Sequence, residues 1–275
     1  YLRTEENALY STNVDTGQTR KIADLPKRGG IAAVNADETI AAGTYIEGDG
    51  PDYGGRRSGQ SHPLEQPMNK GQMMVQRLAA RLPLVLFTVD IATGKINPIL
   101  HSTDWVNHLL FSPTDPSLLM YCHEVPWHKV DRIWTIRTDG SQNTLIHQRS
   151  MSMEIAGHEF WSPYGKNIWY DLQTPKGQVF FLAGYNLETG ERTWYHLERN
   201  EWSIHFNVSR DGTLFCGDGG DRGQVAKAPD GQWIYLFRPE LIRVDPEDSA
   251  GLVRPGILRA ERLVNMAKHN YQLEP

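Results

Sequence analysis

The sequence predicts an all-β fold, a β-propeller of four-stranded blades. Two observations support this fold class: two turn-containing phrases recur at a near-constant period, and helical periodicity is rare. A third is the composition, because 39% of the 275 residues are hydrophobic and 10% are aromatic. Aromatic residues favour half-buried strand positions, and this content is enough for a sizeable core.

The first phrase is a strand, a turn of the form Asp-x-Thr-Gly or x-Asp-Gly, and a second strand. Copies stand at 13–22, 88–100, 136–146 and 185–195, with turn glycines Gly17, Gly94, Gly140 and Gly190. Glycine adopts the positive φ of a tight hairpin without steric cost. Each copy therefore predicts a hairpin.

The second phrase is a small residue, a turn and a hydrophobic strand, at 35–45, 112–121, 162–170 and 209–218. Successive intervals are 46 and 50 residues for the glycines from Gly94 onward, and 50 and 47 for the serines that open the second-phrase turns. Two hairpins in each period of about 40–50 residues are typical of propeller blades. An irregular β-sandwich is the alternative, but it gives no reason for a steady period.

At about 45 residues per blade, the chain covers five to six blades of a larger propeller. It opens inside a strand at Tyr1 and stops at 269–275 without a partner strand. We therefore expect residues 1–275 to form a single propeller domain that is incomplete at both ends.

Residues 45–82 interrupt the repeat. The interval from Gly17 to Gly94 is 77 residues, and the surplus begins as a Gly/Pro-rich loop and continues with helical spacing over 68–82. The insertion is basic, with Arg56, Arg57, Lys70, Arg77 and Arg81. Such insertions rise from one face and shape a cleft, so Arg56 and Arg57 are candidate substrate contacts. A solvated loop is the alternative.

Charge and composition exclude several functional classes. The net charge of −5 argues against a protein that binds nucleic acid through its overall charge. No apolar run is long enough for a membrane span. Cys122 and Cys216 are too few for a disulfide framework. A bacterial-type cytoplasmic or periplasmic location stays open, as does the oligomeric state.

Histidines recur at one point of the repeat. His108, His158 and His205 each stand four residues before the serine of a second-phrase turn. Equal offsets place them at the same height on neighbouring blades, where inner strands converge on the axial channel. Three imidazoles there could form a metal or acid/base site. The alternative is a repeated histidine that hydrogen-bonds within each blade.

Three longer stretches carry a specific resemblance: 121–141, the "HEFW" of 158–161, and 203–219. Their sequences, order and intervals are similar to those of the oligogalacturonate lyases, a family of seven-bladed propellers that degrade pectin. The resemblance implies β-elimination of short oligogalacturonates with a divalent metal, typically manganese. By the same resemblance, Arg132 matches the catalytic arginine, His158 the catalytic base and His205 a metal ligand.

The family's other metal ligands form a Gln…His-x-His motif near the C-terminus. This chain has "MAKHNYQLEP" instead, which contains no His-x-His. His269 and Gln272 are its candidate metal ligands in this stretch. The metal set expected here is His205, His269 and Gln272.

The chemistry of uronate elimination suits these residue types. The proton on C5 becomes acidic only when the neighbouring carboxylate is neutralised, which a divalent cation or an arginine can do. Histidine suits the base because its pKa lies near neutrality. We expect His108, His123 and Glu124 to contact substrate, and Phe160 and Trp161 to fix the ring of His158.

Three other functions stay open from sequence. Glu124 and Glu159 could form the carboxylate pair of a glycosidase. A TolB-like or WD-like propeller could bind a glycan or a protein without catalysis. The chain could also be a lyase for another uronate glycan.

Overall fold

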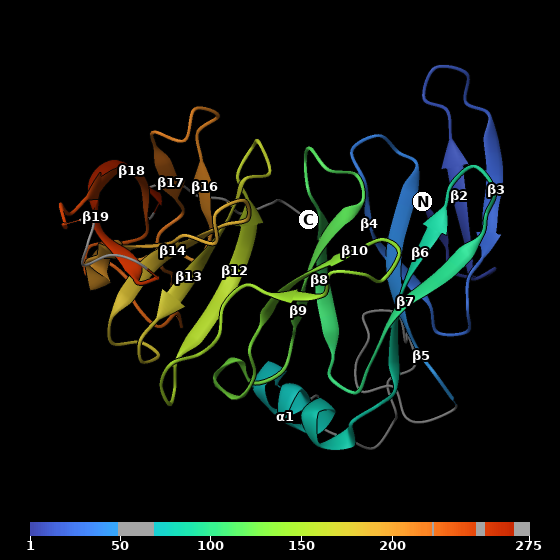
Figure 1. The fold of residues 1–275 in the computed structure, drawn as a ribbon, viewed down its shortest axis with the longest axis horizontal. Coiled ribbons are helices and arrows are strands. Elements are labelled where there is room, and N and C mark those ends of the chain that lie inside the picture. Colours follow the sequence, from blue (N-terminus) through green and yellow to red (C-terminus); the bar gives the residue numbers. More distant parts are fainter. Residues whose placement is uncertain (49–68, 222, 246–250, 267–275) are drawn as a thin grey trace. The chain divides into compact units, whose positions relative to one another are not determined.

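The computed structural model describes residues 1–48, 69–221, 223–245 and 251–266 (Figure 1). The chain divides into two compact units, Tyr1–Ile146 and His147–Pro275. The predictions at Arg56, Arg57, His269 and Gln272 lie outside the described residues.

The first unit contains three antiparallel sheets in chain order. The first sheet comprises β1 (Leu2–Arg3), β2 (Ala8–Thr12) and β3 (Thr19–Asp24). The second comprises β4 (Gly30–Val34), β5 (Ile40–Ile46), β6 (Leu84–Asp90) and β7 (Ile96–Ser102). The third comprises β8 (Val106–Phe111), β9 (Leu118–His123), β10 (Ile133–Arg137) and β11 (Thr144–Leu145). Each four-stranded sheet is a simple meander, the topology of a propeller blade.

One α-helix and one short helix accompany these sheets in the described part of the first unit. Helix α1 (Lys70–Ala80) lies within the predicted insertion, where helical spacing was expected over 68–82. The 3₁₀ helix η1 (Trp127–Lys129) connects β9 to β10. The predicted helix is therefore confirmed.

The second unit contains two further meanders. One comprises β12 (Ile155–Trp161), β13 (Asn167–Gln173), β14 (Phe180–Asn186) and β15 (Arg192–Leu197). After the 3₁₀ helix η2 (Arg199–Glu201), the other comprises β16 (Phe206–Val208), β17 (Phe215–Gly217), β18 (Trp233–Leu241) and β19 (Val253–Asn265). Both follow the blade pattern predicted from the repeats.

The outer strands of these two meanders pair with each other. β15 runs parallel to β19, from Arg192 opposite Val253 to His196 opposite Ile257, which joins them into one eight-stranded sheet. β19 has 13 residues, and two of them, Gly256 and Ile257, pair with β15 on one side and with β18 on the other. The repeats predicted four-stranded blades, and the structure adds a pairing between the outer strands of these two meanders that the repeats did not indicate.

The hydrophobic cores lie between consecutive sheets. In the first unit, Leu86 of the second sheet packs in one cluster with Leu119 and Tyr121 of the third. A separate cluster joins Leu9 of the first sheet to Phe87 of the second. In the second unit, side chains of both meanders share one large aromatic cluster. β6 is buried over Leu84–Val89, as the apolar stretch 82–91 predicted.

The turn glycines behave as the repeats predicted. Gly17, Gly94, Gly140 and Gly190 have φ between 69° and 86°, the left-handed conformation that glycine adopts at little cost. No helix in the described ranges is long and apolar enough to cross a bilayer.

Candidate active site

Two of the repeat histidines occupy β-bulges on the first strand of their sheets. The pairing of β12 with β13 shifts register between Gly157 and Phe160, and His158 there has φ 52°. The pairing of β8 with β9 shifts between Asn107 and Leu110, and His108 there has φ 50°. A left-handed histidine is uncommon, and bulges re-aim side chains near active sites. The shared offset of His108 and His158 in sequence therefore corresponds to the same local structure, a β-bulge with a left-handed histidine.

His205 lies directly before β16, next to His158 in the second unit. The two imidazole rings are 5.2 Å apart between centroids and nearly perpendicular, with an interplanar angle of 81°. The structure thus brings together the predicted base and the predicted metal ligand.

Asp218 holds His205 through both of its carboxylate oxygens. Oδ2 lies 2.6 Å from Nδ1 of the imidazole, and Oδ1 accepts from the backbone N–H of His205 at 2.9 Å. The backbone oxygen of Asp218 accepts in turn from the amide of Gln232. A proton on Nδ1, donated to the carboxylate, leaves Nε2 as the lone-pair nitrogen that a metal requires.

The geometry of His205 fits a metal ligand. Its side chain is 69% exposed, and a carboxylate is one of the groups that commonly orient metal-bound histidines in proteins. The sequence analysis missed Asp218, which stands in "CGDG" after the short strand β17. The available signal was its position directly after the strand that pairs with the residues following His205.

Arg132 and Glu124 form a buried ion pair in the first unit. Their side chains are 3% and 2% exposed, and Arg132 Nη1 donates to Glu124 Oε2 at 2.5 Å. Burial alone would raise the pKa of Glu124, but the Arg132 guanidinium lowers it to about 2, with smaller contributions from His108 and Lys70. Glu124 is therefore ionised at neutral pH. The structure seats the guanidinium of Arg132 against a protein carboxylate, and its role as the catalytic arginine stays a prediction.

Glu124 is also approached by His108 and Lys70. His108 Nε2 lies 3.5 Å from Oε2, and Lys70 Nζ lies 3.2 Å from Oε1. His108, Cys122 and Glu124 place ligand-type atoms within 4.8 Å of one another, which by atom type could hold a metal. The neighbouring guanidinium and ammonium oppose a cation at this place.

His123 has a different environment from the other candidates. Its Nδ1 lies 2.9 Å from Asp104 Oδ2, and the side chain is largely buried. The hydrogen bond to His123 is the largest influence on the pKa of Asp104, which is lowered. Arg81 pairs with the other oxygen of Asp104. His123 is therefore a hydrogen-bond partner of Asp104.

The expected role of Phe160 and Trp161 stays a prediction. Phe160 packs against the aromatic cluster of the second unit, and the ring that lies beside His158 is that of His205. Glu159, on the same strand, is buried.

Comparisons with known proteins agree with the resemblance in sequence. A family model described as oligogalacturonate lyase matches residues 67–236. The oligogalacturonate lyase of Dickeya dadantii is 31% identical over 135 residues, which cover 49% of this chain and 34% of that protein. The oligogalacturonide lyase of Pectobacterium atrosepticum is 31% identical over 137 residues, with 50% and 34% covered. The matched part thus spans about a third of each curated relative.

Solved structures share the fold at lower identity. An oligogalacturonate lyase in complex with manganese superposes with a TM-score of 0.65 at 23% identity, covering 84% of this chain and 56% of that one. An oligogalacturonate lyase from Vibrio parahaemolyticus gives a TM-score of 0.68 at 23% identity, with 98% and 65% covered. Because the family model matches well over half of the residues, the chain belongs to the oligogalacturonate lyase family.

Proposed function

We propose that this protein is a lyase that cleaves short oligogalacturonates by metal-assisted β-elimination. The observation that carries the proposal is the His158–His205 pair, in which one imidazole is re-aimed by a bulge and the other is oriented by Asp218. Family membership supplies the substrate class, an oligomer of galacturonic acid.

In this reaction the C5 proton leaves, a double bond forms between C4 and C5, and the C4–O bond to the neighbouring sugar breaks. His158 is the base that takes the C5 proton, since imidazole has a pKa near neutrality and the bulge in β12 re-aims this side chain. The leaving oxygen takes up a proton, so the products are one saturated and one unsaturated oligosaccharide. By the family resemblance Arg132 is the catalytic arginine, since a guanidinium can stabilise the negative charge that develops in such a transition state.

A divalent metal fits the donor set in part. His205 would hold it through Nε2, together with His269 and Gln272, and manganese is the metal named for the structural relative. When bound, such a cation neutralises the uronate carboxylate as a Lewis acid.

The finer architecture belongs to the same proposal. We infer that the meanders are blades of a seven-bladed propeller, and that residues 1–275 form one domain. The topology of each sheet and the cores between consecutive sheets support this inference.

The test is ultraviolet absorbance of the unsaturated product during incubation with trigalacturonate and manganese. The informative variant is His158→Asn, because asparagine tolerates the left-handed backbone at this position while the imidazole is lost. We expect at least a hundredfold loss of kcat, since general base catalysis contributes about 10²–10⁴-fold.

Met153→Asn is the matched control. Met153 also has a positive φ, lies in the same unit and is exposed. Wild-type rates in a folded His158→Asn protein would remove His158 as the base. A folded, manganese-loaded wild type that releases no unsaturated product from trigalacturonate would refute the lyase proposal.

A further inference from the structure

We propose that Gln232 is a positioning residue for the metal ligand His205, on which it acts through the backbone of Asp218. The inference rests on the proposed function, because that function makes His205 a ligand of the metal. It adds a residue that lies 27 positions further along the chain and that the sequence analysis gave no role.

The backbone of Asp218 decides where its carboxylate lies, because an aspartate side chain has only two rotatable bonds. The ladder between β16 and β17 ends with Phe206 opposite Gly217, one residue before Asp218. Beyond that point, the backbone oxygen of Asp218 accepts from Gln232 Nε2 at 2.9 Å. The amide of Gln232 therefore restrains Asp218 from outside the hairpin that carries it.

Glycines on both sides of this aspartate let the turn pack closely against its neighbours. A Cβ on Gly217 would lie 2.3 Å from Ser203 Oγ, and a Cβ on Gly219 would lie 2.5 Å from the backbone oxygen of Trp233. The N–H of Gly219 also donates to Ser203 Oγ at 3.1 Å, and Ser203 is fully buried. The turn thus lies against the residue that follows Gln232, which brings the amide within reach.

The segment that carries Gln232 is itself held by the end of β19. The backbone oxygen of Gln232 accepts from the N–H of Met266, the residue after β19, at 2.7 Å. The backbone oxygen of Asp230 accepts from Asn265 Nδ2, and its carboxylate accepts from Arg262, each at 3.0 Å. The amide is therefore presented to the turn from a fixed place.

The chemical consequence concerns the tautomer of His205. Its Nδ1 lies 2.6 Å from one carboxylate oxygen of Asp218, and its backbone N–H donates to the other. If the turn shifts, both contacts loosen, and the proton of a neutral imidazole is no longer held on Nδ1. A smaller share of the protein then offers the lone pair on Nε2 that a metal needs.

The test measures the His205 tautomer in metal-free protein at pH 8, by NMR of isotope-labelled imidazoles, and manganese affinity by calorimetry. Gln232→Met keeps the length of the side chain without the donor, and Gln232→Glu keeps its shape with a carboxylate in place of the amide. We expect both variants to lower the share of His205 with its proton on Nδ1. We expect manganese binding to weaken about fivefold, the effect of losing one hydrogen bond.

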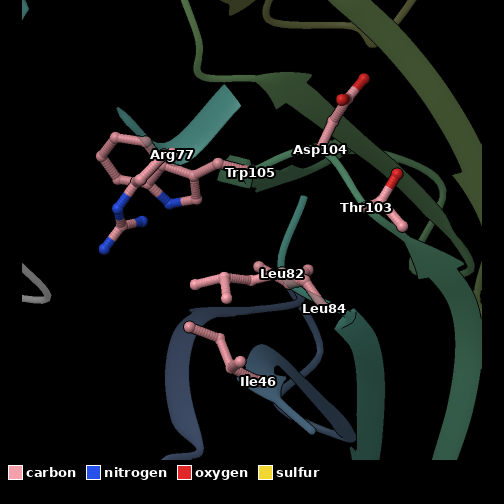
Figure 2. A pocket seen from close by; sticks show the side chains of 7 residues that line it. All are labelled: Ile46, Arg77, Leu82, Leu84, Thr103, Asp104 and Trp105. Carbon is pink, nitrogen blue, oxygen red and sulfur yellow. The ribbon is translucent and has the colours of Figure 1, made fainter. Parts of the chain in front are cut away.

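The chain offers two controls. Gln224→Met is the matched variant, because Gln224 is exposed in the same loop and its backbone N–H donates to Asp221; it should bind manganese as wild type. His123 is the reference in the spectra, since its Nδ1 faces Asp104 in the other unit. Figure 2 shows Asp104 near Trp105 at a small pocket of that unit. The His123 tautomer should be the same in every variant.

A double-mutant cycle with Asp218→Asn separates positioning from a general effect on stability. Because Gln232 is proposed to act through Asp218, Gln232→Met should add little to the loss of manganese affinity that Asp218→Asn causes. Additive losses would overturn the proposal, as would an unchanged His205 tautomer in both Gln232 variants. Tautomer and metal binding are read without turnover, so a wild type that binds manganese but releases no unsaturated product would refute only the lyase proposal.

Discussion

His158 and His108 show how single residues combine sequence position with backbone conformation. Both stand four residues before a turn serine, and both adopt the left-handed conformation within a bulge. Histidine is among the non-glycine residues that tolerate this region best. The repeat spacing predicted that the two positions are equivalent, but the bulge that aims the side chains depends on pairing with the next strand.

Asp218 provides the first prediction at this scale. Asp218→Asn would exchange the charged acceptor of His205 Nδ1 for an amide, which weakens control of the tautomer and ring orientation. We expect manganese affinity to fall about 10–100-fold, measured by calorimetric titration of the metal. Asp211→Asn is the control, because Asp211 lies in the turn of the same hairpin and caps only that turn. Equal affinities in the two variants would contradict the role given to Asp218.

Asp171 is a second carboxylate outside the sequence predictions. It is buried on β13, where its oxygens accept from Trp202 Nε1 and Gln173 Nε2, each at 2.8 Å. Burial raises its pKa to about 7, and the two hydrogen bonds offset only part of this effect.

A pH dependence of stability follows from Asp171. The pKa is raised in the folded state, so folding is favoured most below the unfolded pKa near 4, and this contribution is lost as pH rises to 7. The difference amounts to about 4 kcal/mol of unfolding free energy at the upper limit. We expect Asp171→Asn, measured by urea unfolding at pH 5 and pH 8, to lose less stability between these values than wild type. An identical loss in both proteins would exclude Asp171 as its source.

Among the elements, β19 joins the two meanders of the second unit into one sheet, which its sequence did not indicate. It pairs with β18 on one side and with β15 on the other, and Gly256 takes part in both ladders. A Cβ on Gly256 would lie 2.4 Å from Cδ1 of Tyr195 and 2.9 Å from the backbone oxygen of Glu240. The absence of a side chain at Gly256 therefore permits the close approach of three strands.

Gly256→Ala tests this close approach. Overpacking of this kind costs about 1–3 kcal/mol, so we expect a lower urea midpoint and faster hydrogen exchange in β15 and β19. Gly157→Ala is the stability control, because a Cβ there meets no heavy atom within 4 Å. Equal stability of the two variants would show that the strands can move apart freely.

At the scale of the whole molecule, each unit has its own hydrophobic core, built between consecutive sheets. Among the described residues these cores consist of aliphatic and aromatic side chains, and the candidate metal ligand His205 is exposed outside them. We therefore expect that loss of the metal abolishes the proposed activity without unfolding the sheets.

Removal of divalent metal tests that separation. We expect EDTA followed by desalting to abolish formation of the unsaturated product, and added manganese to restore it, while the far-ultraviolet circular dichroism spectrum stays unchanged. Full activity in the chelated protein would contradict a Lewis-acid role for the metal. A parallel loss of the strand spectrum would instead show that the metal stabilises the sheets.

Much of the architecture could be predicted from sequence because hairpins are local. The turn glycines, the four-stranded meanders and the helix after residue 68 depend on φ preferences and periodicity within a few residues. The roles of His158, His205 and Arg132 came from motif resemblance, and they stay proposals. The pairing of β15 with β19 had no local signal.

The sequence by itself determined the all-β class, the blade period and the candidate residues, since these are properties of short stretches and their spacing. Only the tertiary structure decided which charges meet. It buried Arg132 against Glu124, brought Lys70 to the same carboxylate and set Asp218 behind His205. The physical reason is that such contacts join residues from different strands and helices. Their energies depend on distance and burial, and the order of residues alone specifies neither.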